Sequence, residues 1–226
     1  MTAEQHLQWV SDHLNQGLVW LKNQCVNDGK LSNACLDEHQ QATYDLALST
    51  SEIRCAQAYL ETARSTSDLN ETMAETFAAS MIQSTLNRLL LSPQDVGLTR
   101  AALAAPDALE AFLDANLRAE HLAKIGADLI TVNGETQGRG LPESQQMIAD
   151  TFRQFADEVV APLAESIHRE DQIIPDAILE GLKQLGCFGL SVPEQYGGLL
   201  PDDREDTLGM IVVTEELSRV SLGGAG

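Results

Sequence analysis

Basic residues are scarce in this sequence. It has 14 lysines and arginines against 34 aspartates and glutamates, which gives a formal net charge of −20. A surface with this balance repels nucleic-acid phosphates and anionic lipids, and no basic stripe offsets it. The composition argues against nucleic-acid binding and is typical of an acidic cytoplasmic protein.

Long apolar runs and targeting signals are lacking as well. No window approaches the ~20 consecutive apolar residues that a membrane span needs. The first ten residues, MTAEQHLQWV, have neither the basic start nor the apolar core of a signal peptide. We therefore expect no membrane span and a cytoplasmic location.

Motifs for metal and phosphate chemistry are missing too. Cys25, Cys35, Cys55 and Cys187 show no C-x-x-C spacing, which favours reduced, structural thiols. The five histidines are scattered, and no Glu-x-x-His repeat of a di-iron bundle occurs. No G-x-G-x-x-G turn follows a strand pattern. We predict no metal site.

Helical periodicity fills the first half of the chain. Apolar residues recur every three or four positions through residues 4–25, and Asn27-Asp28-Gly29 ends that pattern. Ser67 is a candidate N-cap for a further helix, which Ser92-Pro93 ends. Pro106 suits the first turn of a long helix reaching residue 129.

The stretch of residues 36–63 predicts one more long helix. Tyr44 and Cys55 lie on one apolar side, and Leu46 and Ile53 lie on another. Two apolar sides indicate a helix packed between neighbours. Four long helices with short connections predict an antiparallel bundle over residues 1–130.

A glycine-rich segment separates the two halves. Its sequence, TVNGETQGRGLP, holds three glycines and a proline without apolar periodicity. We predict a linker over residues 131–143 and a second domain over residues 144–226.

The second domain is predicted to be helical throughout, which makes the whole chain all-α. Ser144 is a candidate cap for its first helix, and Pro162 should bend that helix near Glu158. A second helix begins after Ile174-Pro175 and ends at Gly186, and a third follows Pro201.

The loop between the last two helices contains several residues with special backbone conformational preferences. Its sequence over residues 190–198 is LSVPEQYGG. Pro193 fixes its own φ, whereas Gly197 and Gly198 allow conformations that a side chain forbids. Glu194 and Tyr196 lie between them. The glycines are expected to serve tight backbone packing.

Three motifs over residues 144–226 carry a family resemblance. They are FADEVVAPLAESIHRED, then LKQLGCFGLSVPEQYGGL, and then TEELSR, in that order. This part of the chain resembles the N-terminal helical domain of the acyl-CoA dehydrogenases. The resemblance implies an FAD-dependent oxidoreductase that forms a double bond between adjacent carbons of an acyl-CoA thioester.

The family also implies partners and an assembly. An electron-transfer flavoprotein is the expected electron acceptor, and the full-length enzyme is expected to be a homodimer or homotetramer. A helical extension ahead of the pattern is similar to that of one branch of the family, which acts on a short branched dicarboxylic acyl-CoA.

The catalytic segments of the family have no counterpart here. The resemblance implies that FAD is held mainly by a central β-domain and a C-terminal helical domain, and that the catalytic base lies beyond Gly226. We therefore expect the chain to be an incomplete, inactive piece of a larger flavoenzyme.

The residues after the E-E-L motif are the candidate substrate contacts. In the family this position lines the deep end of the acyl cavity, which places Ser221, Leu222 and Gly223 at its wall. The alternative is that these residues only end a helix. Adjacent Glu215 and Glu216 project about 100° apart on a helix and form no catalytic pair. The spacing from Glu216 to Arg219 predicts an ion pair instead.

Two other functions remain open at this point. One is a non-catalytic helical module for oligomerisation or interaction, derived from the same family. The other is an acyl-CoA oxidase, which passes electrons to oxygen.

Overall fold

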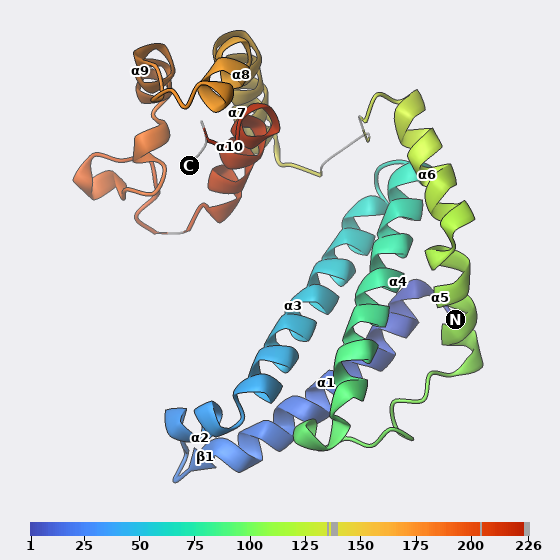
Figure 1. Cartoon of the computed structure of the whole chain (residues 1–226). Helices are drawn as coiled ribbons and strands as arrows, with labels where there is room; N and C mark the ends of the chain where they lie inside the picture. Colours follow the sequence, from blue (N-terminus) through green and yellow to red (C-terminus); the bar gives the residue numbers. More distant parts are fainter. Residues whose placement is uncertain (135, 137–139, 204, 224–226) are drawn as a thin grey trace. The chain divides into compact units, whose positions relative to one another are not determined.

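The computed structural model describes residues 1–134, 136, 140–203 and 205–223. The chain divides into two compact units, Met1–Gly140 and Leu141–Gly226. Apart from one short hairpin, the regular secondary structure of the described residues is helical, which confirms the predicted all-α class (Figure 1). Residues 135 and 137–139 of the predicted linker and residues 224–226 lie outside the described residues. None of the described helices is both long and apolar enough to cross a membrane.

Helix α1 (Ala3–Cys25) confirms the first predicted helix. Thr2 and Gln5 form a capping box, in which each side chain accepts a hydrogen bond from the other's backbone N–H. Its apolar stripe is buried from Leu7 through Leu14 to Cys25. A hairpin of β1 (Val26–Asn27) and β2 (Lys30–Leu31) follows, with Val26 paired to Leu31.

The predicted helix over residues 36–63 is two helices. α2 (Asn33–Glu38) and α3 (Gln40–Ala63) meet at His39, whose backbone leaves the helical region. The expectation that this helix packs between neighbours is confirmed, because α3 lies against both α1 and α4. Leu46 and Ile53 are buried, whereas Tyr44 is 62% exposed and Cys55 is exposed. Of the two predicted apolar sides, the one with Leu46 and Ile53 is the more deeply buried.

Helix α4 (Asp68–Leu91) begins at the predicted cap, where the Ser67 hydroxyl accepts a hydrogen bond from Asn70 N at 3.3 Å. Ala74 and Ala78 are fully buried, and such small side chains let neighbouring helices approach closely. α1, α3 and α4 lie side by side as the long helices of the bundle (Figure 1).

The helix predicted from Pro106 to residue 129 is broken in two. α5 (Asp107–Leu117) and α6 (Ala119–Thr131) are separated by Arg118, which has an extended ψ of 141°. Pro106 precedes the first helical residue rather than occupying the first turn. A short 3₁₀ turn, η1 (Pro93–Val96), follows α4. The break at Arg118 has no glycine or proline signal in the sequence.

A buried histidine lies where α1 meets α5. His6 is 1% exposed and its ring stacks on Phe112 with centroids 4.8 Å apart. Its Nδ1 has no hydrogen-bond partner among the described residues. Burial lowers the pKa of His6 below its ordinary value of 6.5, and the N-terminal charge adds to that shift.

His6 should make stability depend on pH. Below pH 6.5 the unfolded imidazole binds a proton that the folded one resists, so the free energy of unfolding falls as pH falls. Replacing His6 with phenylalanine should remove this part of the pH dependence. Urea unfolding at pH 7.5 and pH 5.5 measures it, with the exposed His168 replaced by glutamine as the control. An equal loss of stability in wild type and His6→Phe would contradict this assignment.

The second unit begins with one helix interrupted by a wide turn. α7 (Glu143–Phe155) leads into a π-helical turn, η2 (Ala156–Val160), and then into α8 (Ala161–Arg169). The interruption lies where Pro162 is expected to disturb the helix, since Pro162 has no N–H to donate. Ala161 N instead donates to Ala156 O across the wider turn. Ser144 is not the cap, because Pro142 precedes the first helical residue.

Two further helices close this unit. α9 (Asp176–Gln184) ends near Gly186, which takes the left-handed conformation at φ 74°. α10 (Thr207–Val220) begins at Asp206, whose carboxylate accepts a hydrogen bond from Gly209 N at 3.0 Å. Two 3₁₀ turns, η3 (Cys187–Gly189) and η4 (Glu194–Tyr196), lie between these helices. The core comprises Phe152, Ala156, Val160, Ile167, Ile178, Leu182, Val213 and Leu217.

Candidate functional site

The loop singled out in the sequence is folded back on itself by backbone hydrogen bonds. Pro193 and Leu200 form a parallel bridge, in which Glu194 N donates to Leu200 O at 2.9 Å. Leu200 N in turn donates to Val192 O at 3.0 Å. The loop is thus a closed backbone structure, even though it holds no regular strand.

The two glycines of this loop have different reasons to be there. Gly197 has φ 84°, a conformation that side chains rarely adopt. A Cβ on Gly198 would lie 1.8 Å from the carbonyl oxygen of Val192, which is backbone and cannot rotate away. Tyr196 is 75% exposed and Glu194 is also exposed. The glycines allow close backbone packing, while the side chains of η4 face solvent.

The buried glutamate of the E-E-L motif belongs to an ion-pair network. Glu216 is 1% exposed and accepts hydrogen bonds from Arg153 Nε at 3.0 Å and Nη2 at 3.4 Å. Arg219 Nε lies 3.5 Å from the same carboxylate, which confirms the pair predicted by spacing. Arg219 also donates to Asp157 at 2.6 Å. This network joins α10 to α7 and the π turn.

The three predicted pocket residues lie together at the C-terminal end of α10. Ser221, Leu222 and Gly223 line a cavity of about 750 Å³. The opposite wall comes from α8 and the segment after it, and comprises Ala161, Ala164, Glu165, Ile167, His168, Asp171, Gln172 and Ile174. No local pattern indicates that α8 would face these residues, because more than one helix separates them in the chain.

The chemistry of this cavity is mixed. Ile167, Ile174 and Val220 supply apolar surface, and Leu222 is 76% exposed. Its described lining residues include no lysine or arginine. Glu165 is paired with Arg169 at 2.7 Å, in an exposed contact along α8. The cavity can accept a short apolar or branched chain, and His168, Gln172 and Ser221 could donate hydrogen bonds to a polar end.

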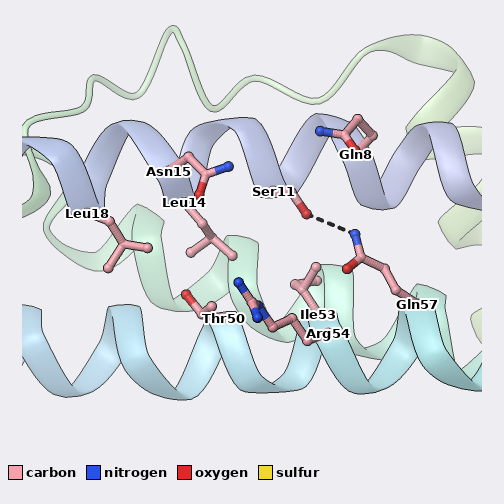
Figure 2. Close-up of a pocket in the computed structure, with 9 residues that line it drawn as sticks. All are labelled: Gln8, Ser11, Leu14, Asn15, Leu18, Thr50, Ile53, Arg54 and Gln57. Atoms are coloured by element: carbon pink, nitrogen blue, oxygen red, sulfur yellow. Dashed lines mark hydrogen bonds between the residues drawn. The ribbon is translucent and has the colours of Figure 1, made fainter.

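A second hollow lies in the first unit between α1 and α3. It has a volume of about 460 Å³, and Gln57 Nε2 donates to Ser11 Oγ across it at 3.2 Å (Figure 2). Leu14 and Ile53 are buried, and they line the hollow together with polar side chains and Arg54. The described residues that line it include no histidine, cysteine or carboxylate, so they offer no group suited to acid–base or nucleophilic work near neutral pH. None of the predicted site residues lies there.

One cluster of side chains has no counterpart in the sequence motifs. Cys25, Cys35 and His39 are brought together so that their sulfur and nitrogen atoms lie within 4.8 Å of one another. The spacing matches no familiar motif, and the apolar periodicity predicts a continuous helix through His39. The signal that could have found them is the Asp28-Gly29 turn, which folds Cys35 back onto the end of α1.

Comparisons with known proteins show a family similarity in the second unit. Residues 142–226 match the family model described as "Acyl-CoA dehydrogenase, N-terminal domain". The chain is 31% identical over 221 residues to (2S)-methylsuccinyl-CoA dehydrogenase of Cereibacter sphaeroides, which covers 90% of this chain and 38% of that protein.

Other relatives match over a smaller share of the chain. Benzylmalonyl-CoA dehydrogenase of Aromatoleum aromaticum is 41% identical over 58 residues, or 26% of this chain and 15% of that protein. The mitochondrial short-chain specific acyl-CoA dehydrogenase of Homo sapiens is 34% identical over 79 residues, or 35% and 18%. The chain spans well under half the length of each of these relatives.

Proposed function

Because residues 142–226 match the N-terminal domain of the acyl-CoA dehydrogenases, we propose that this chain supplies one wall of the acyl-binding site of an FAD-dependent acyl-CoA dehydrogenase. The observation that carries the proposal is the cavity at the end of α10. Ser221, Leu222 and Gly223 follow the E-E-L motif directly and line that cavity against α8.

The proposed substrate is a short branched acyl-CoA. The similarity to (2S)-methylsuccinyl-CoA dehydrogenase extends over 90% of this chain, including the first unit. This favours conversion of (2S)-methylsuccinyl-CoA to mesaconyl-CoA as the specific reaction. The apolar surface of Ile167, Ile174 and Val220 suits a short branched chain, and His168 or Gln172 could donate to its second carboxylate.

The described residues of this chain do not form a site that could bind most of the FAD molecule. Their β-structure is the hairpin of β1 and β2, and it leads into no glycine-rich turn at a helix N-terminus. In the proposed enzyme, FAD would supply the acceptor for the hydride and would be held by other segments. The part played by this chain is to position the acyl chain and keep water from it.

The electron acceptor and the assembly belong to the same proposal. We expect an electron-transfer flavoprotein to reoxidise the enzyme, which would be a homodimer or homotetramer. Flavin reoxidation with that acceptor or with oxygen distinguishes a dehydrogenase from an oxidase. A protein that binds neither FAD nor acyl-CoA in its full-length form would be the non-catalytic helical module instead.

Replacing Leu222 with tryptophan in the full-length enzyme should raise KM for acyl-CoA by about tenfold. The larger ring would occupy part of the cavity that the acyl chain needs, which corresponds to ~1.4 kcal/mol of lost binding. Steady-state kinetics with a flavin-reduction readout measure the change. Tryptophan at Ile211, a 55% exposed position on α10 outside the cavity lining, is the matched control. Unchanged kinetics in Leu222→Trp would exclude a pocket role.

A further inference from the structure

Two cysteines meet at the end of the helical bundle in the first unit. Cys25 is the last residue of α1, and Cys35 lies in α2. Their sulfur atoms are 2.6 Å apart. His39 follows α2 directly, and a ring nitrogen lies within 4.8 Å of both sulfurs.

Local backbone structure holds this pair in place. The hairpin reverses the chain so that Ser32 N donates to Cys25 O at 2.8 Å. The Ser32 hydroxyl then caps α2 by accepting from Cys35 N at 3.3 Å. The two cysteines are thus held by the same turn, and both also pack in the core of the bundle.

The short sulfur separation distinguishes two kinds of chemistry. Two thiolates sharing a tetrahedral zinc ion, each about 2.3 Å from it, stand roughly 3.8 Å apart. A disulfide bond is about 2.05 Å long. At 2.6 Å the sulfurs are much nearer to the bonded distance, so forming a disulfide needs the smaller movement.

We propose that Cys25 and Cys35 are a redox-active pair that forms a reversible intramolecular disulfide, with a peroxide as the oxidant. Cys35 is half-buried and Cys25 is buried, so Cys35 is the sulfur that the oxidant reaches first. This site is independent of the acyl-binding cavity, which lies in the other unit.

The reaction balances with hydrogen peroxide alone. The Cys35 thiolate attacks one peroxide oxygen, the O–O bond breaks, and Cys35 becomes a sulfenic acid as hydroxide leaves. The Cys25 sulfur then attacks the Cys35 sulfur, and the S–O bond breaks to release a second hydroxide. The protons of the two thiols convert both hydroxides to water, so two thiols and one peroxide give one disulfide and two waters.

His39 has a role in the second step. Burial, reinforced by the hydrogen bond with Cys35, raises the pKa of the Cys25 thiol to about 11. Cys25 therefore keeps its proton at neutral pH and needs a base as it attacks. A ring nitrogen of His39 lies within 4.8 Å of the Cys25 sulfur, and the imidazole is the base assigned to take this proton.

The test is oxidation of the full-length protein with hydrogen peroxide, followed by thiol blocking and tryptic mapping without reductant. Cleavage after Lys22, Lys30 and Arg54 places Cys25 and Cys35 in separate peptides, residues 23–30 and 31–54. We expect these peptides to remain linked until dithiothreitol is added. The oxidised protein should also unfold roughly 5 °C higher than the reduced protein, because the bond closes a loop in the unfolded chain.

Variants make the assignment specific. Cys35→Ala should abolish the linked peptides, whereas Cys55→Ser, at an exposed position on α3, should leave them unchanged. His39→Gln should slow their formation several-fold. Peptides that stay separate after oxidation would overturn the proposal. A second result would also overturn it: the reduced protein binds one zinc ion, Cys35→Ala abolishes that binding, and oxidation gives no linked peptides.

Discussion

Replacing Gly198 with alanine is expected to lower the thermal unfolding midpoint of the second unit by at least about 10 °C, from a destabilisation of roughly 3 kcal/mol. The added Cβ would lie 1.8 Å from Val192 O. That oxygen accepts the hydrogen bond from Leu200 N, so moving it aside would also break the bridge that closes the loop. Circular dichroism at increasing temperature measures the change.

Two other glycines provide a graded control. Gly197 has φ 84°, but beyond its chain neighbours no heavy atom lies within 4 Å of the place that an alanine Cβ would take there, so Gly197→Ala should cost only about 1 kcal/mol of backbone strain. Gly126 lies inside α6 with open space around it, and Gly126→Ala should be neutral or stabilise by about 0.5 kcal/mol. Equal losses for Gly198→Ala and Gly197→Ala would show that the contact with Val192 does not matter.

Replacing Arg153 with alanine is expected to destabilise the second unit by about 3 kcal/mol. The carboxylate of Glu216 is 1% exposed, and removing a cation that lies 3.0 Å from it weakens the compensation of a buried charge. This loss is at the low end for a buried pair because the Arg153 side chain is itself 39% exposed. Urea unfolding monitored by circular dichroism measures it.

Two variants separate the charge effect from lost packing. Arg169→Ala removes an ion pair in which both side chains are highly exposed, at 73% and 75%, and should cost under about 0.5 kcal/mol. The double variant Arg153→Met with Glu216→Leu removes both charges and should recover much of the lost stability. If the double variant were as unstable as the sum of its two single changes, the buried charge would not be the cause.

Much of the helical architecture follows from local signals in the sequence. The Ser67 cap, the stripe of α1 and the Asp28-Gly29 turn each act within a few residues, so they could be predicted. The breaks at His39 and Arg118 could not, since neither position has the glycine or proline that usually marks a helix end. Similarly, the disturbance at Pro162 was predictable, but its π-helical form was not.

The residues of the candidate acyl-binding site could be predicted only in part. The family resemblance, which the match of residues 142–226 confirms, points to Ser221, Leu222 and Gly223 by position alone. The cavity they share with α8 depends on packing between segments about 50 residues apart, and no local pattern encodes it. The pairing of Arg153 with Glu216, at a separation of 63 residues, escaped prediction for the same reason.

The π turn has a consequence for the phase of the helix that contains it. Phe152, Ala156 and Val160 are all buried at a strict spacing of four, whereas a regular α-helix would rotate each of them about 40° past the last. The wider turn takes up that rotation and keeps the three in line. The wider turn thus sets the direction in which the side chains of α8 project. In a regular α-helix they would project in another direction, and the α8 residues that line the cavity would not face it.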